Sequence, residues 1–411
     1  MSIPGPLELI RKYRYLTNDT KKLVLFYGIE SAGSAMGSFI SIFYIISLGY
    51  GLVFYGIFTA VGGISFVAFL LPMSSSSSFL GSKRSVMLGT AFQALSDVLI
   101  GFSTQRTAII SSAVVWSLGA SLLSPNYGAL VSKSESAEMR THGFSASGFT
   151  SQMGTFAGTA ASGMLASALY QYVGKVDSYR AVFLVSAAII MISMYPARIS
   201  SVNIRGSMPK LKEQSYGIIY RLMIPAMLIG AGAGFLIPYF PVQFKERFGA
   251  SVQLISIIFS LTSLFMAFFM LYMPYIERNR GSLRSIVSSW MVSTFFMIAM
   301  PLAGVFGFMA LPIFSAFYFF RTVIMNAISP VQSSFELSLL KEQHRPLASS
   351  LETLAWNAAN AGTVILGAMV MRYSLDLPFY ICAAFYISAS LLYYRFFRNF
   401  RVGIAHIIAD Q

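Results

Sequence analysis

Long apolar segments, separated by short polar connections, follow one another along the whole chain. A helix needs ~20 mostly apolar residues to cross the ~30 Å of hydrocarbon in a bilayer. Segments of about this length lie at approximately 23–47, 51–72, 85–103, 108–132, 143–172, 179–196, 217–243, 251–273, 285–304, 307–333, 346–371 and 377–397. The pattern predicts an all-α, polytopic membrane protein with twelve transmembrane helices.

Composition and charge agree with a bilayer as the solvent. Of the 411 residues, 56% are hydrophobic and 11% are charged, whereas a soluble domain carries roughly 25% charged residues. The net charge of +14 would suggest a nucleic acid partner in a soluble protein, but here the basic residues lie in the short connections. We therefore expect no nucleic acid partner and interpret the charge as a topology signal.

The basic residues are divided unevenly between the two sides of the predicted membrane. With the N-terminus placed in the cytoplasm, 22 of the 29 lysines and arginines lie on the cytoplasmic side, six lie outside, and Arg321 lies within a span. Membrane proteins carry this excess in their cytoplasmic connections. We expect a multi-pass protein of the cell membrane with both termini in the cytoplasm.

An internal repeat relates the two halves of the chain. Ser-Pro pairs end at Pro125 and Pro330, and an arginine follows each proline by 15 residues, at Arg140 and Arg345. The offset of 205 residues is half the chain length. It predicts two pseudo-symmetric six-helix bundles, at 1–196 and 217–411, joined by a polar, basic cytoplasmic linker at 197–216.

The same offset relates two rows of small residues at every fourth position of the fifth and eleventh spans. The rows are Thr150, Gly154, Gly158 and Ser162 in the first half, and Ala355, Ala359, Thr363 and Gly367 in the second. Small residues at this spacing form a groove in which another helix backbone can approach closely. Both spans are therefore predicted to be interface helices.

Two connecting loops carry the clearest resemblance to a known family. The segment 74–89 keeps a glycine and two basic residues of a G-x-L-a-D-R-x-G-R-R-type loop, with Ser78 in place of the acid, and 274–284 is its second copy. The matching residues are Gly81, Lys83, Arg84, Glu277, Arg278 and Gly281. With the helix patterns at 232–251 and 317–357, the whole chain resembles the major facilitator superfamily (MFS), and 317–357 looks like its drug:proton antiporter branches. Gly154 and Gly158 fit the antiporter motif of that family, but Thr159 replaces its proline.

The resemblance implies a secondary transporter that works by alternating access. In that family the first and tenth helices line a cavity, and the loops named above hold helices across the two halves. Separately, Gly232, Gly234, Pro238 and Pro241 could let the seventh helix bend at its outer end, which makes this bend a candidate gate. Ordinary helix termination at these prolines is the alternative.

Four charged residues lie inside predicted spans, where they are costly and often functional. Glu30 is a candidate for proton coupling or substrate binding, or a structural carboxylate bonded to neighbouring hydroxyls. Arg321 can hold a substrate anion or pair with Glu352 on the next helix, and Glu352 is the deputy proton carrier. Asp97 is a weaker coupling candidate, because a partner for Gln93 or a solvated outer face also explains it.

Uncharged candidates for the cavity wall are polar or aromatic residues within the spans. They are Tyr27, Trp116, Asn126, Gln152, Tyr239, Asn326, Trp356, Asn357 and Asn360. For the amides, a hydrogen bond between helices is the alternative role.

No enzyme chemistry is indicated. The single cysteine, Cys382, lies in an apolar stretch, and the three histidines lie outside the spans, so we expect no metal and no cofactor. The sequence favours a monomeric, proton-coupled exporter of a small organic solute. Proton-coupled uptake of a metabolite anion at Arg321 is the alternative, and a membrane sensor or a lipid-modifying enzyme fits less well.

Overall fold

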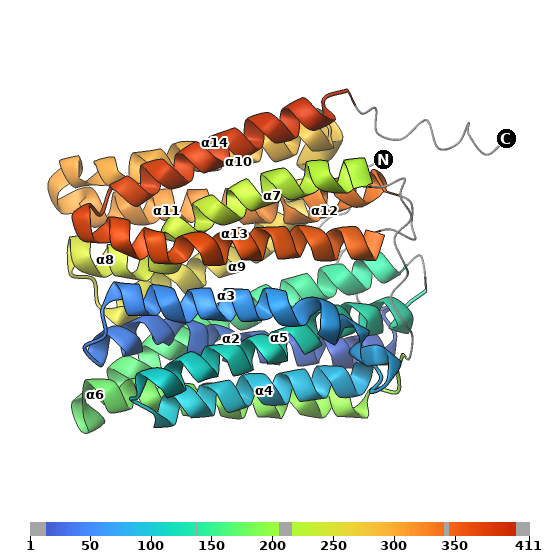
Figure 1. Cartoon of the computed structure of the whole chain (residues 1–411), viewed down its shortest axis with the longest axis horizontal. Helices are drawn as coiled ribbons and strands as arrows, with labels where there is room; N and C mark the ends of the chain where they lie inside the picture. Colours follow the sequence, from blue (N-terminus) through green and yellow to red (C-terminus); the bar gives the residue numbers. More distant parts are fainter. Residues whose placement is uncertain (1–13, 137–138, 205–215, 341–344, 400–411) are drawn as a thin grey trace. The chain divides into compact units, whose positions relative to one another are not determined.

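The computed structural model describes residues 14–136, 139–204, 216–340 and 345–399, and every regular element within these ranges is a helix (Figure 1). The elements are α2 (Asn18–Ser47), α3 (Leu52–Ser74), η1 (Ser75–Ser78), α4 (Ser82–Phe102), α5 (Arg106–Ser134), α6 (Arg140–Ile199), α7 (Tyr216–Leu236), η3 (Ile237–Tyr239), α8 (Phe240–Phe248), α9 (Val252–Arg280), α10 (Ser282–Ala299), η4 (Met300–Met309), α11 (Ala310–Ala327), α12 (Ser329–Ser338), α13 (Arg345–Tyr373) and α14 (Leu377–Phe397).

Ten helical stretches in the described ranges are long and apolar enough to cross a membrane. Two of them, His142–Ile199 and Ser282–Ser338, have 58 and 57 residues, about 85 Å of straight helix and nearly three times the hydrocarbon thickness. Each is interrupted by one glycine with non-helical backbone angles, Gly174 and Gly307. Counting these two stretches twice gives twelve crossings, as the hydrophobic pattern predicts.

One predicted connection is almost absent from the structure. The sequence predicts a connection at 173–178, but α6 departs from helical angles only at Gly174, with a φ of 78°. Since positive φ is readily accessible to glycine alone, this residue lets the chain change direction with almost no loop.

Contacts divide the chain into two compact units. Unit 1 comprises Met1–Met208 with Phe244–Ala267, and unit 2 comprises Pro209–Gln243 with Phe268–Gln411. The first division lies within the predicted linker. The segment Phe244–Ala267 belongs to unit 1 by its contacts, with Phe259 beside Phe39 at 5.8 Å between ring centroids.

Both units use the same helix pairings, as the internal repeat requires. In unit 1, α2 packs along α6 and α4 along α5; in unit 2, α7 packs along α13 and α10 along α11. Gly81 and Gly281 precede α4 and α10 with nearly identical angles, φ 82° and ψ 144° against φ 80° and ψ 149°. These glycines are 200 residues apart. The offset between the two copies of the repeat is therefore 200 residues at this loop, and 205 residues from the Ser-Pro pairs onward.

The small-residue row of α6 lies against α2 at intervals of one turn. Ser162 donates a hydrogen bond to the carbonyl oxygen of Met36 at 2.9 Å. At Gly154 and Gly158 the backbones are so close that a Cβ on Gly158 would overlap the carbonyl oxygen of Ala32. The predicted interface role of this helix is confirmed.

The corresponding row of α13 makes the equivalent contacts in unit 2. Thr363 donates to the carbonyl oxygen of Ala231 at 2.8 Å, and a Cβ on Gly367 would lie 2.6 Å from the carbonyl oxygen of Phe235. In unit 1 the residues at these contacts are Ala32 and Met36 of α2, and Ala231 and Phe235 lie 199 positions after them. The two interfaces are therefore copies of one another.

Candidate functional site

Glu30 is buried in unit 1, with 4% of its surface exposed. The hydroxyl of Ser34, one turn further along α2, donates to its Oε1 at 3.0 Å, and Ser31 and Gln93 also hydrogen-bond to the carboxyl group. In the described part of the chain it forms no ion pair. The carboxyl group is thus surrounded by neutral polar groups from α2 and α4.

Hydroxyl groups extend this polar surrounding from α2 into α6. The hydroxyls of Ser31 and Ser151 lie 2.8 Å apart. Tyr27, one turn before Ser31, stacks on Tyr127 of α5 with ring centroids 4.3 Å apart. Glu30 therefore lies where α2, α4, α5 and α6 bring polar side chains together.

Asp97 is the second buried acid of unit 1, with 7% of its surface exposed. The Ser186 hydroxyl on α6 donates to its Oδ2 and also lies 2.7 Å from the carbonyl oxygen of Gly33 on α2. A Cβ on Gly37 would lie 2.8 Å from Oδ2, so the carboxyl group rests directly against the α2 backbone. The interpretation that Asp97 lies on a solvated outer face is wrong, because α2 and α6 cover its carboxyl group.

The two acids therefore lie along one face of α2. Asp97 contacts α2 at Gly37, seven residues and about 10 Å along the axis from Glu30. Neither acid has a basic partner among the described residues. A buried carboxyl group without a counter-ion is least costly when it carries a proton, and such groups can bind and release protons.

Arg321 is buried in unit 2, with 3% of its surface exposed. One guanidinium nitrogen donates to the Tyr386 hydroxyl at 3.1 Å, and the group lies over the rings of Tyr386 and Phe240, 5.6 and 5.5 Å from their centroids. Its Nε has no hydrogen-bond partner in the described structure. The arginine is held by aromatic groups from α8 and α14.

The predicted pair between Arg321 and Glu352 is wrong. The guanidinium faces α8 and α14, while Glu352 on α13 hydrogen-bonds to the carboxyl group of Glu336 on α12. Glu336 is 6% exposed and was missed, because the predicted tenth span ends at 333 whereas α12 continues to Ser338. A longer span would have included this acid.

The remaining candidates of unit 1 differ in their surroundings. Trp116 is 39% exposed. Asn126 is buried and donates to the Ser76 hydroxyl and to its own helix, which uses its amide within the bundle. Gln152 is half-buried, and its Oε1 is enclosed without a hydrogen-bond partner among the described residues.

The candidates of unit 2 mostly bond to backbone carbonyls. The Tyr239 hydroxyl donates to Val364 on α13 at 2.6 Å, and Asn360 donates to Gly230 on α7 at 3.3 Å. The amides of Asn326 and Asn357 donate within their own helices, to residues one turn earlier, and Trp356 is 37% exposed. A role for any of them in a cavity wall stays a prediction.

The predicted interruption of the seventh helix is confirmed in its position. Helix α7 ends at Leu236, and Pro238 lies in the 3-10 turn that leads to α8, which includes Pro241. The structure gives Gly234 a packing role. A Cβ on Gly234 would overlap the Thr363 hydroxyl, so this glycine allows close packing of α7 on α13.

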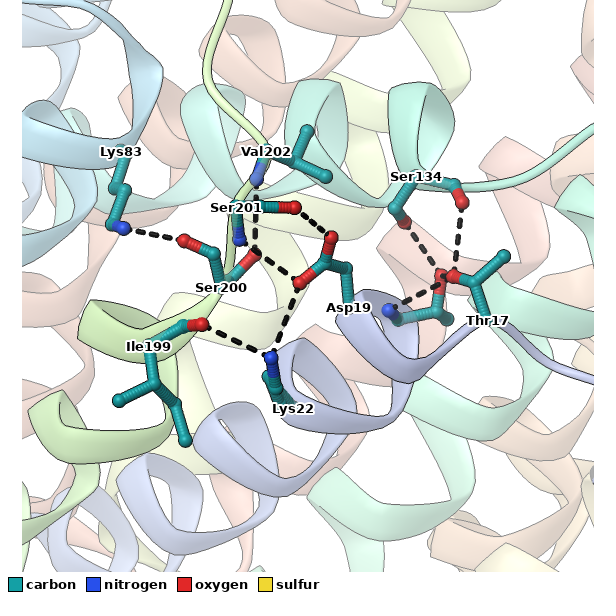
Figure 2. Close-up of polar contacts among 10 residues, drawn as sticks. Thr17, Asp19, Lys22, Lys83, Ser134, Ile199, Ser200, Ser201 and Val202 are labelled. Atoms are coloured by element: carbon teal, nitrogen blue, oxygen red, sulfur yellow. Dashed lines mark hydrogen bonds and ion pairs between the residues drawn. The ribbon is translucent and has the colours of Figure 1, made fainter.

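Contacts at the start of α4 hold the beginning of the predicted linker within unit 1 (Figure 2). The Lys83 ammonium group donates to the carbonyl oxygen of Ser200, and a Cβ on Gly81 would lie 2.7 Å from the Asn203 side chain. From α2, Asp19 accepts hydrogen bonds from the backbone and hydroxyl of Ser201.

The other predicted loop contacts are less fully described. Arg84 is exposed at the start of α4. In the second copy, Gly281 precedes α10, whereas Glu277 and Arg278 belong to α9 with side chains outside the described structure.

Comparison with known proteins identifies the family. Residues 23–331 match the model of the Major Facilitator Superfamily. No curated protein matches the chain in sequence. Among solved structures, the chain is similar to a POT family transporter in complex with 5-aminolevulinic acid, with 13% identity, a TM-score of 0.74, and coverage of 92% of this chain and 95% of that one.

Two bacterial proteins are similar to the same degree. One is a homologue of the human lysosomal transporter Spinster, in an inward-facing and occupied conformation, with 13% identity, a TM-score of 0.73, and coverage of 97% and 98%. The other is a homologue of the iron transporter ferroportin, with 16% identity, a TM-score of 0.73, and coverage of 92% and 98%. At these identities the structures show the fold alone, but the match to the family model covers most of the chain. The chain therefore belongs to the major facilitator superfamily and is a secondary transporter.

Proposed function

We propose that this transporter exports a small organic solute in exchange for protons, with Glu30 as the main proton-binding residue and Asp97 as a second one. The observation that supports the proposal is the pair of buried carboxyl groups along one face of α2, each bonded to neutral donors. Neither forms an ion pair with a described residue. Proton binding is the simplest way to neutralise such groups.

The surroundings of the two acids favour proton exchange over a structural role. A carboxylate kept for stability is usually paired or bonded to a charged donor, since isolated buried charge is costly. Glu30 and Asp97 instead meet serine hydroxyls and an amide, which can hydrogen-bond to either protonation state. The resemblance of 317–357 to drug:proton antiporter branches supports export.

The test is flux in liposomes that contain the purified protein and an imposed pH gradient. Glu30→Gln is expected to abolish pH-driven flux while the melting temperature stays near the wild-type value. Glu246→Gln, at an exposed glutamate of α8, is the matched control and should retain flux. Coupled flux at the wild-type rate in Glu30→Gln would sink the proposal.

A second candidate function is uptake of a metabolite anion, and Arg321 favours it. The guanidinium is buried without an acidic partner in the described structure, and its Nε is unpaired. An anionic solute would supply the missing acceptor. Accumulation of carboxylate solutes that is lost in Arg321→Met would favour uptake over export.

The proposal also includes the location, oligomeric state and orientation of the transporter. We place the transporter in the cell membrane as a monomer, with both termini in the cytoplasm, and propose the proton as its coupling ion. We also propose that residues 1–196 and 217–411 are its two six-helix bundles.

A further inference from the structure

Glu336 accepts hydrogen bonds from several directions in unit 2. The Gln332 amide, one turn earlier in α12, donates to its Oε1 at 2.9 Å, and the Tyr393 hydroxyl of α14 donates to the same atom at 3.1 Å. The third partner is the carboxyl group of Glu352 on α13. Two carboxyl groups thus meet between α12 and α13.

Two carboxyl groups can hydrogen-bond to each other only when one carries a proton, because two carboxylates offer acceptors alone. The other donors indicate which group carries it. An amide N–H and a phenol O–H both point at Glu336, and ionised carboxylates attract such donors most strongly. The proton therefore belongs on Glu352, which donates it to a Glu336 carboxylate.

Basic groups do not neutralise this pair in the described structure. Neither carboxyl group forms an ion pair, and the third helix at the site contributes Tyr393, itself packed on the Trp290 ring of α10 at 5.0 Å. On the helices of unit 2 around the site, Arg221 of α7, Arg284 of α10 and Arg395 of α14 are exposed. The buried Arg321 of α11 donates to the Tyr386 hydroxyl instead. Since no ion pair to either acid is present among the described residues, a proton can supply the missing positive charge.

The repeat shows that the helix packing does not require these acids. At an offset of 205 residues, the counterparts of Gln332, Glu336 and Glu352 in unit 1 are the uncharged Tyr127, Val131 and Ser147. There the Tyr127 hydroxyl donates to the Ser147 hydroxyl at 2.7 Å, and Val131 is fully buried. Unit 1 closes the same junction without charge, so the acids of unit 2 serve another purpose.

We propose that Glu336 and Glu352 form a proton-binding site in unit 2, separate from the acids of α2 and α4, in which one shared proton fastens α12 to α13. Release breaks the O–H bond of Glu352 and sends the proton to water. Two adjacent carboxylates remain, and their repulsion weakens the contact between the helices. The site therefore makes this end of unit 2 sensitive to pH, whatever solute is carried.

Infrared spectroscopy of the purified protein tests the proposal, because a protonated carboxyl group has its own C=O stretching band. Glu352→Gln is expected to remove one such band, because the carboxyl group that carries the proton is gone. The introduced amide can still donate to Glu336 in place of the O–H. Glu336→Gln should keep the band but shift it, because the O–H then meets an amide carbonyl. Glu246→Gln, at an exposed acid, should leave the band unchanged.

The pH dependence of the melting temperature gives a second readout. The shared proton stabilises the folded state, so this stability is present at acidic pH and lost as the pH rises through its release. Glu352→Gln should flatten that loss, and Glu246→Gln should not. An unchanged protonated-carboxyl band in Glu352→Gln, or an unshifted one in Glu336→Gln, overturns the proposal.

The outcome is distinguishable from that for Glu30. Glu30→Gln is expected to abolish flux while the band of the Glu352 carboxyl group remains. The site in unit 2 can thus fail without affecting the proposed transport function, and the reverse also holds.

Discussion

The buried charged residues differ in the partners that burial gives them. Glu30 and Asp97 meet hydroxyl and amide groups, Glu352 meets another carboxyl group, and Arg321 meets a phenol and two rings. Within the described residues, the ion pairs join only exposed or half-exposed neighbours on one helix, such as Arg180 with Asp177 at 2.7 Å. The buried charged residues therefore do not neutralise one another in the described structure. This arrangement is expected of charged residues that bind protons or a solute.

Arg321 offers a test of this view at a single residue. Arg321→Met replaces a desolvated cation by an apolar side chain of similar length, among Phe240 and Tyr386. Replacing buried ions in this way is often neutral or stabilising by about 1–4 kcal/mol. We expect a melting temperature equal to or above that of the wild type, with loss of any anion uptake.

The control for this substitution is Arg284→Met, at an exposed arginine on α10, which should change neither stability nor uptake. A melting temperature several degrees below wild type for Arg321→Met would mean that the contacts with Tyr386 and the rings make the arginine structural.

At the scale of elements, small residues set how closely the long helices approach. A Cβ on Gly158 would overlap the backbone of α2 at Ala32, whereas a Cβ on Gly148, in the same helix, has no atom within 4 Å. The same contrast recurs in α13 between Gly367 and Gly362. Each interface helix therefore contains at least one glycine that packing requires and at least one that it does not.

Gly158 and Gly148 of α6 give a matched pair of variants. Gly158→Ala must push α2 and α6 apart, and overpacking of this kind costs about 1–3 kcal/mol. Gly148→Ala meets open space and should gain up to about 1 kcal/mol from the higher helix propensity of alanine. Thermal unfolding of both variants measures the difference, and equal melting temperatures would contradict the close contact.

The sequence predicts the elements well, because the bilayer fixes how long an apolar helix must be. The span 377–397 coincides with α14, and the four-residue spacing of Gly154 and Gly158 predicts their interface. Pairing of side chains was harder to predict. Arg321 and Glu352 lie on consecutive spans, but spacing along the chain does not determine which way each helix faces, and the arginine turns to α14 instead.

At the scale of the whole molecule, the repeat fixes the fold and the differences between its copies carry the chemistry. The helix pairings recur in both units, down to Gly81 and Gly281 before α4 and α10. The acids and the buried arginine do not recur. Offsets of 200 and 205 residues place no charge opposite Glu30, Arg321 or Glu352. A scaffold shared by two units thus leaves each unit free to bind a different charge.

The orientation of the chain in the membrane is the last prediction, and its single cysteine makes it accessible to experiment. Cys382 is fully buried, so it should react little with a membrane-impermeant maleimide and leave a low background. Gln105 before α5 and Ser136 after it are exposed, at opposite ends of one crossing. With the basic connections in the cytoplasm, Gln105→Cys should be labelled in intact cells and Ser136→Cys only after permeabilisation. Because both cysteines flank the same helix, labelling of Ser136→Cys alone in intact cells would contradict the proposed topology. The 22 basic residues would then lie on the outer side of the membrane.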